Sequence, residues 1–193
     1  GEGKTTVAAS LADFLARSGN RTLLIDADLR NPSLSKMLGY ADAPGLLDVV
    51  ANQTPFDELV ITDSKHKFDF LPSATRIKPS NSSDILSSPA MKALLKSVKS
   101  SYDYVVIDLP PILPVVDVKA TAHLFEAFLL VVEWGATSTD EVVKAVGTSS
   151  IVSERLLGAV LNKADEAVMR RFEGYSDRSY GYYSDEKPHS ETV

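Results

Sequence analysis

Four short apolar runs, each about as long as a β-strand, are spaced along the chain. They are RTLLIDADLRNP (21–32), YDYVVIDLPP (102–111), AFLLVVEWG (127–135) and LLGAVLNK (156–163). A continuous apolar run indicates a strand that is buried on both faces, as in a parallel sheet. Because helical patterns separate these runs, we expect an α/β fold, a mostly parallel sheet with helices on both faces. Ligands of such sheets bind at the C-terminal ends of the strands.

The helical patterns carry start signals. Ser88 can cap a helix that has Pro89 at its first position, and Ser138 and Glu141 have the spacing of a capping box. A further helix is expected to begin at about Thr5. Its predicted apolar face consists of Val7, Leu11, Phe14 and Leu15.

The chain opens with GEGKTT, Gly1 to Thr6, which matches the end of the phosphate-binding pattern G-x-x-x-x-G-K-[ST]. Glycines let backbone N–H groups close on phosphates, and the positive end of the following helix favours anions. Lys4 would contact the β- and γ-phosphates of a nucleotide, and Thr5 would offer its hydroxyl to Mg²⁺. The strand that should feed this loop would lie upstream of Gly1, and we expect the native chain to continue there.

Carboxylates follow two of the apolar runs. Asp26 and Asp28 are two residues apart and share a face of an extended chain, and Asp108 occupies the position of a Walker B carboxylate. Beside a phosphate loop, these acids are candidates to serve Mg²⁺ and an incoming nucleophile. Arg30 has two options, pairing with the aspartates or facing a phosphate. Asn162 could read an adenine edge or act as a turn residue.

Composition excludes several classes of protein. A formal net charge of −6 and a pI of about 5.1 argue against a protein that grips nucleic acid through its phosphates. The absence of cysteine excludes disulfides, zinc–cysteine clusters and cysteine nucleophiles, and fits a reducing cytoplasm. No apolar run of about 18 residues and no signal peptide occur, so we expect any membrane attachment to lie outside this sequence or on a partner.

The apolar periodicity stops at about Phe172. This predicts one globular domain, residues 1–171, followed by a flexible tail, residues 172–193. Four of the seven tyrosines fall in the tail: Tyr175, Tyr180, Tyr182 and Tyr183.

Taken together, these residues resemble the bacterial tyrosine kinases of the polysaccharide co-polymerase type, whose cytoplasmic domains are deviant Walker P-loop ATPases. The resemblance covers nearly the whole chain. It rests on GEGKTT as the end of Walker A, LLIDADLRNP as Walker A′, VVIDLPP as Walker B, and the tyrosine-rich C-terminus. The segment LPSATRIKPSN (71–81) departs from the pattern, because it lacks the glycine expected after LP.

The resemblance implies an autokinase that uses ATP and Mg²⁺ to phosphorylate its own terminal tyrosines, usually those of a neighbouring subunit. By motif match, the nucleotide-binding residues would be Gly1, Glu2, Gly3, Lys4, Thr5, Thr6 and Asn162. The catalytic residues would be Lys4, Asp26, Asp28 and Asp108. The Mg²⁺ ligands would be Thr5, Asp26 and Asp108. The phosphate acceptors would be Tyr175, Tyr180, Tyr182 and Tyr183.

The resemblance also implies partners and a location. We expect a homo-oligomeric ring, a membrane-spanning co-polymerase domain fused upstream or carried by a partner, and a tyrosine phosphatase. No nucleic-acid partner is expected. The chain would be a cytoplasmic domain at the bacterial inner membrane, where it would regulate the polymerisation and export of exopolysaccharide or capsule.

Two other functions stay open at this point. A positioning or partition ATPase of the same fold would dimerise around ATP and use hydrolysis as a timer. Such ATPases usually carry a lysine in the first part of the loop, which would precede Gly1. A non-catalytic regulator would bind nucleotide and organise polysaccharide machinery, and its tail would be merely a sticky aromatic segment. Phosphate on the tail tyrosines after incubation with Mg-ATP would discriminate the kinase from both.

Overall fold

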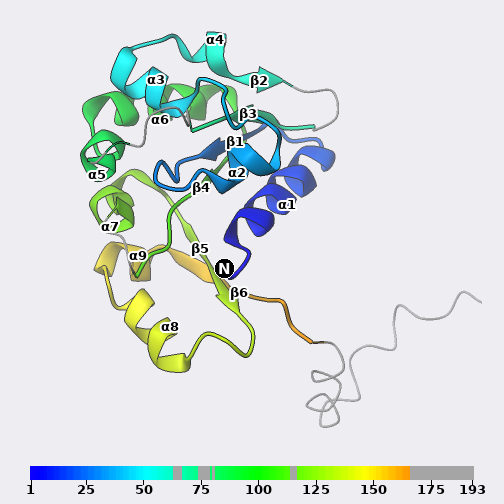
Figure 1. The fold of residues 1–193 in the computed structure, drawn as a ribbon, viewed down its shortest axis with the longest axis vertical. Coiled ribbons are helices and arrows are strands. Elements are labelled where there is room, and N and C mark those ends of the chain that lie inside the picture. The colour runs from blue at the N-terminus through cyan, green and yellow to red at the C-terminus, as the bar shows by residue number, and fades with distance from the viewer. Residues whose placement is uncertain (63–66, 74–78, 80, 114–116, 166–193) are drawn as a thin grey trace, which may run out of the picture.

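The computed structural model describes residues 1–62, 67–73, 79, 81–113 and 117–165, so the predicted tail and its four tyrosines lie outside the described residues. Within this part of the chain the strands form two groups (Figure 1). The first is a four-stranded sheet in the order β2-β3-β1-β4, with β1 at Thr22–Asp26, β2 at Ile61–Thr62, β3 at Asp69–Leu71 and β4 at Tyr104–Asp108. The second is a pair, β5 (Phe128–Glu133) and β6 (Leu156–Asn162).

Helices connect and cover these strands (Figure 1). In chain order they are α1 (Lys4–Arg17), α2 (Ser33–Met37), α3 (Leu46–Asn52), α4 (Phe56–Leu59), α5 (Ser82–Leu86), α6 (Pro89–Ser101), α7 (Asp117–Thr121), a 3₁₀ turn η1 (Ala122–Leu124), α8 (Thr139–Val146) and α9 (Ser150–Glu154).

The predicted α/β class with a mostly parallel sheet is confirmed. Strand β1 runs parallel to both β3 and β4, β5 runs parallel to β6, and only the short β2 is antiparallel to its neighbour within the described residues. The two groups are not joined, because β4 has no strand on its outer edge in this part of the chain. All five residues of β1 are buried, whereas Tyr104 at the start of β4 is 47% exposed.

Successive side chains of β1 point to opposite faces of the sheet, as they must in a strand. Leu23 and Ile25 enter a hydrophobic cluster with α3, α5 and α6. Leu24 enters a second cluster with α1 and α2. Helices therefore cover both faces, which explains why this run is apolar throughout.

Helix α1 begins at Lys4, one residue before the predicted start, but its buried face differs from the prediction. Ala12 and Ala16 are buried, whereas Phe14 is 66% exposed. Alanine side chains allow a helix to approach a sheet closely, and α1 contacts both β1 and β4. The small residues thus form the contact surface, and the prediction was wrong for Phe14.

The predicted helix caps of α6 and α8 are confirmed. The Ser88 hydroxyl accepts a hydrogen bond from the Met91 amide at 3.2 Å. Ser138 and Glu141 form the reciprocal bonds of a capping box at the start of α8. Because these signals act over three or four residues, they could be read directly from the sequence.

Candidate nucleotide and metal site

The phosphate loop ends at Gly3, which precedes the first residue of α1. Its backbone has φ +84°, in the left-handed region that favours glycine. A Cβ at this position would lie 2.2 Å from Nδ2 of Asn162. That amide donates a hydrogen bond to the carbonyl oxygen of Glu2 at 2.8 Å. The backbone angle and the close approach of Asn162 therefore both require glycine here.

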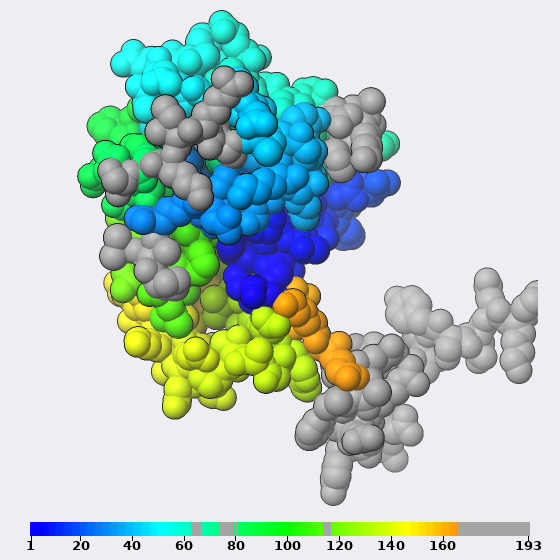
Figure 2. Space-filling model, viewed as in Figure 1, coloured from blue at the N-terminus to red at the C-terminus, as the bar shows by residue number. Residues whose placement is uncertain are grey.

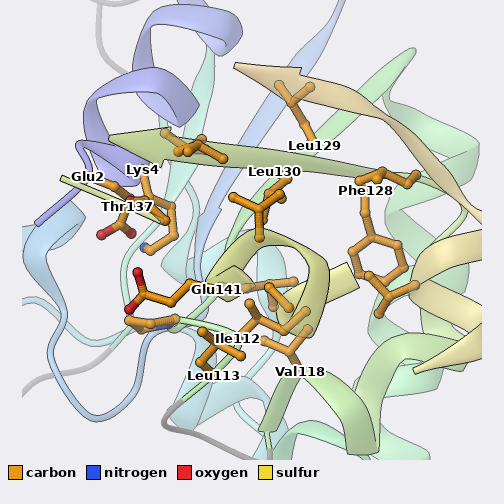
Figure 3. A pocket seen from close by; sticks show the side chains of 18 of the residues that line it. Glu2, Lys4, Ile112, Leu113, Val118, Phe128, Leu129, Leu130, Thr137 and Glu141 are labelled. Carbon is orange, nitrogen blue, oxygen red and sulfur yellow. The ribbon is translucent and has the colours of Figure 1, made fainter. Parts of the chain in front are cut away.

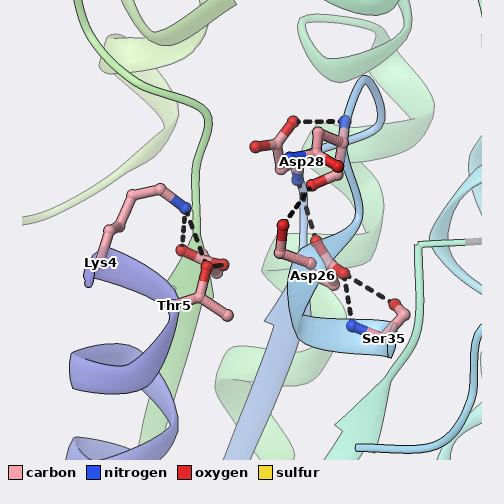
Figure 4. A network of polar contacts seen from close by, with 8 residues as sticks. Lys4, Thr5, Asp26, Asp28 and Ser35 are labelled. Atoms are coloured by element: carbon pink, nitrogen blue, oxygen red, sulfur yellow. Dashed lines mark hydrogen bonds and ion pairs between the residues drawn. The ribbon is translucent and has the colours of Figure 1, made fainter. Parts of the chain in front are cut away.

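Lys4 and Thr5 meet the Walker B aspartate. The Lys4 Nζ lies 2.5 Å from Oδ1 of Asp108, and the Thr5 hydroxyl donates to Oδ2 at 2.8 Å (Figure 4). The Asp108 side chain is only 1% exposed. Its negative charge is thus compensated by the Lys4 ammonium group, and the Thr5 hydroxyl adds a hydrogen bond, both from the first turn of α1.

Asp26 lies beside Asp108, because the two residues are register partners at the ends of parallel strands. Asp26 is fully buried and accepts hydrogen bonds from the amide and hydroxyl of Ser35, at 2.8 and 2.7 Å, and from the amide of Asp28 at 3.2 Å (Figure 4). Burial raises the pKa of Asp26 to about 6, with a smaller contribution from the Asp108 charge, although the Ser35 bonds oppose the shift.

The Arg30 guanidinium binds neither Asp26 nor Asp28 in the structure, although the Arg30 backbone remains hydrogen-bonded to Asp28. Asp28 is 6% exposed and accepts from the amide of Asn31 at 3.0 Å. Burial raises its pKa, although the Asn31 bond and the Lys4 charge lower it. The Arg30 guanidinium binds Asp117, at 3.0 Å from Nε and 3.2 Å from Nη2. Of the two options open for Arg30, pairing with Asp26 or Asp28 is not the one observed.

The ends of β5 and β6 lie against the loop. Asn162, at the end of β6, contacts Glu2, and the Lys163 ammonium donates to the Gly1 carbonyl and to Glu133 at the end of β5. Figure 2 shows the N-terminal residues packed against the segment that follows β6. The remaining predicted loop residues, Gly1 and Thr6, are exposed.

Hard oxygen ligands for Mg²⁺ are available from Thr5 and Asp108, whose oxygens are in hydrogen-bond contact. Asp26 is adjacent, but its carboxylate is engaged by Ser35 and Asp28. No group of three or more histidine or acidic residues able to hold a metal by themselves occurs among the described residues. One hydroxyl and one carboxylate suit Mg²⁺, which usually binds one or two protein carboxylates together with waters and substrate phosphates.

An apolar cavity of about 260 Å³ adjoins this site, and the sequence patterns did not predict it. Glu2 and Lys4 lie at one end and Phe128 at the other (Figure 3). Its walls come mainly from β5, from α8 and from residues 109–113 after β4. Since the lining is mostly aliphatic, the cavity is an apolar space between β5, α8 and the segment after β4 rather than a phosphate site.

Sequence patterns also missed three side chains that hold the site together: Ser35, Ser82 and Asp117. Ser35 binds Asp26 from nine positions away, and Asp117 binds Arg30 from 87 positions away. None stands in a recognisable motif, so only the folded chain reveals them.

A family model described as an AAA domain matches residues 1–155. The tyrosine-protein kinase YwqD of Bacillus subtilis (strain 168) is 33% identical over 183 residues, which cover 95% of this chain and 73% of YwqD. The chain belongs to the bacterial tyrosine kinases.

Two further proteins support this family assignment. The succinoglycan biosynthesis transport protein ExoP of Rhizobium meliloti (strain 1021) is 38% identical over 177 residues, or 91% of this chain but only 22% of ExoP. The kinase domain of VpsO superposes with a TM-score of 0.78 at 32% identity, covering 86% of this chain and 80% of that one.

A structural neighbour from another class is the septum site-determining protein MinD of Pyrococcus horikoshii OT3, solved with Mg-ADP. It has a TM-score of 0.66 at 26% identity and covers 83% of this chain and 65% of MinD. Among the described residues, no helix has both the length and the apolar character needed to cross a membrane.

Proposed function

We propose that this chain is a kinase domain that transfers the γ-phosphoryl group of Mg-ATP to tyrosine side chains. The observation that carries the proposal is the convergence of Lys4, Thr5 and Asp108 at the start of α1, with two buried aspartates beside them. Family membership supplies tyrosine as the acceptor class. The chain spans 22% of ExoP, so the activity of a whole protein of that kind is part of the proposal.

The mechanism requires Lys4 to change partners. In the structure its ammonium group neutralises Asp108. With nucleotide bound, Lys4 would contact the β- and γ-phosphates, and Asp108 and Thr5 would be available to hold Mg²⁺ through their oxygens. Bound Mg²⁺ would neutralise negative charge on the phosphates. The Lys4–Asp108 pair thus keeps both charges compensated before the substrate arrives.

Transfer forms a bond between the tyrosine oxygen and the γ-phosphorus and breaks the bond from that phosphorus to the β–γ bridging oxygen. The tyrosine proton passes to a carboxylate, and Asp26 and Asp28 are the candidates. Burial raises the pKa of both, which makes each a better proton acceptor than an exposed aspartate. Comparing the pH–rate profiles of Asp26→Asn and Asp28→Asn identifies the base, because only its loss removes the acidic limb.

We propose the tail tyrosines, Tyr175, Tyr180, Tyr182 and Tyr183, as acceptors in a neighbouring subunit of a ring. An extended chain from Phe172 to Tyr183 would span roughly 35 to 40 Å at about 3.3 to 3.6 Å per residue. Each phosphate adds about 1.5 to 2 negative charges, so phosphorylation should favour disassembly of the ring. Equal sedimentation of phosphorylated and unphosphorylated full-length protein would refute the disassembly.

The first test is mass spectrometry of the full-length protein after incubation with Mg-ATP. The expected result is phosphate on the tail tyrosines that is absent in Lys4→Met. Lys92→Met is the matched control, because Lys92 is an exposed lysine on α6 away from the site. Steady ATP hydrolysis with unmodified tyrosines would instead support a switch ATPase, the alternative favoured by the likeness to MinD.

The relatives also support a role for the whole protein. We propose that it regulates exopolysaccharide or capsule polymerisation and export at the inner membrane, through a co-polymerase domain fused upstream or carried by a partner, with a phosphatase that reverses the modification. ExoP is named for succinoglycan biosynthesis and transport. The expected result of a chromosomal Lys4→Met substitution is an altered polymer chain length, and an unchanged length distribution would contradict this role.

We further propose that the gap between β4 and β5 receives the strand predicted to feed the phosphate loop. The outer edge of β4 is unpaired among the described residues, the cavity beside β5 is apolar, and Lys4 lies at its end. A parallel strand here would join the two groups into one sheet. Hydrogen exchange on the full-length protein tests this, since β4 amides facing the gap should be strongly protected.

A further inference from the structure

Asp117 is a buried acid outside the predicted site. Its side chain is 2% exposed, yet it accepts three hydrogen bonds from two other parts of the chain. Arg30 donates from Nε at 3.0 Å and from Nη2 at 3.2 Å, and the Ser82 hydroxyl donates at 2.7 Å. Asp117 therefore joins the loop after β1, the helix α5 and the start of α7 at a single carboxylate.

The Arg30–Asp117 ion pair is bidentate. A guanidinium that binds a carboxylate through two parallel N–H groups fixes direction as well as distance, which a lysine cannot do. Because the carboxylate is buried, removal of Arg30 would leave an uncompensated charge inside the protein and lower its stability. The arginine side chain itself stays 44% exposed.

This pair bears on the reaction through Asp28. Arg30 follows Asp28 by two residues. Between them Leu29 packs in the hydrophobic core. The Asn31 amide donates to Asp28 and the Ser35 amide donates to Asp26, so the Arg30 side chain is the anchor on the far side of Asp28. The loop leaves β1 at Asp26, the register partner of Asp108, and Asp108 binds Lys4, so the loop lies at the phosphate end of the sheet. A loose Arg30 would therefore allow a candidate proton acceptor to move relative to Lys4.

We propose that Asp117 is a positioning residue for phosphoryl transfer: its bidentate hold on Arg30 fixes the loop that carries Asp28. This inference rests on the proposed kinase function. Among the described residues Asp117 makes its side-chain hydrogen bonds to Arg30 and Ser82 and none to Lys4, Thr5 or Asp108, so its loss should leave nucleotide binding intact. The effect belongs to kcat, since a misplacement of about 1 Å at a reacting group lowers rates by up to roughly 100-fold.

The experiment compares steady-state kinetics of the full-length protein and its variants. Asp117→Asn keeps the volume and removes the charge, and we expect kcat for tyrosine phosphorylation to fall at least about tenfold while KM for ATP changes less than about twofold. Arg30→Lys keeps the positive charge near Asp117 but removes the fork, so it should fold normally and still lose kcat. Wild-type kcat in Arg30→Lys would overturn the proposal even if Asp117→Asn fails to fold.

A double-mutant cycle separates positioning from general stability. If Asp117 acts through Arg30, adding Asp117→Asn to Arg30→Lys should lower kcat little further. If the two residues act independently, the fold losses in kcat of the single variants should multiply in the double variant. Ser82→Ala is the matched control, because it removes one bond to Asp117 and leaves the fork in place. It should lower thermal stability without changing kcat. Equal kcat losses in Ser82→Ala and Asp117→Asn would also overturn the positioning role.

Failure of the kinase proposal is distinguishable in the same assay. Phosphotyrosine and ADP are measured together in each reaction. If the wild type forms ADP but no phosphotyrosine, the kinase function fails, and the variants are compared by kcat for hydrolysis. A tenfold loss of hydrolysis in Asp117→Asn would then still support Asp117 as a positioning residue, and unchanged hydrolysis would refute it.

Discussion

Substitution of Gly3 by alanine tests whether the phosphate loop depends on its contact with β6. The left-handed backbone, φ +84°, costs a residue with a Cβ about 1 to 2 kcal/mol. The new methyl group would also lie 2.2 Å from the Asn162 amide and displace it from the Glu2 carbonyl, a hydrogen bond of about 1 kcal/mol. The total is about 2 to 3 kcal/mol, which corresponds to a loss of ATP affinity of roughly 30- to 150-fold if it falls on the nucleotide-binding conformation.

The assay is a fluorescence titration with Mg-ATP. Trp134 is the chain's single tryptophan, and its amide donates to the Asn162 carbonyl at 2.9 Å, so its emission should report events at the loop. Gly19→Ala is the matched control. Gly19, at the far end of α1, has φ +92°, but an added Cβ would meet no atom within 4 Å. This substitution should lower stability by about 1 to 2 kcal/mol and leave ATP affinity unchanged.

The close approach is tested by adding Asn162→Ala. On that background Gly3→Ala should lose only the backbone strain, roughly 5- to 30-fold in affinity, because the colliding amide is gone. Affinity losses that simply multiply in the double variant would refute the role of the contact. Wild-type affinity in Gly3→Ala alone would refute the whole argument.

Three further predictions follow from single interactions. The pKa of Asp26 is about 6 in the folded protein, against an ordinary value of 3.8. The protonated carboxyl therefore stabilises the fold by about 3 kcal/mol below pH 3.8, and this stabilisation is lost as pH rises through 6. Asp26→Asn should therefore raise the free energy of unfolding, measured in urea at pH 8. The gain should be less than about 3 kcal/mol, because the NH₂ group of the asparagine meets the Asp28 amide, and it should vanish near pH 4. An equal gain at pH 8 and pH 4 would contradict this prediction. Lys4→Met leaves the buried Asp108 without its cation and should lower the free energy of unfolding by about 1 to 3 kcal/mol, measured by thermal denaturation, whereas Lys92→Met should not. Ser88→Ala removes the α6 cap and should lower stability by about 1 kcal/mol with unchanged ATP affinity; a changed affinity would show that α6 influences the site.

The sequence by itself determined the features that depend on neighbouring residues. The apolar runs become strands β1, β4, β5 and β6, the caps at Ser88 and Ser138 start their helices, and the glycine, lysine and threonine of the loop open α1. Because parallel strands end at one edge of a sheet, the sequence also predicted that Asp26 and Asp108 lie at the same edge, whereas their pairing as neighbours is seen only in the structure. The signals in the sequence act over a few residues, so periodicity and motif spacing suffice to read them.

Only the tertiary structure decided which distant groups meet. Arg30 binds Asp117 across 87 positions, and Asn162 reaches the loop carbonyl of Glu2 across 160. The same holds for α1, where packing against the sheet selected the alanines and left Phe14 in solvent. A side chain's hydrophobicity or charge states what kind of partner it needs, but the partner itself depends on which surfaces the fold brings together.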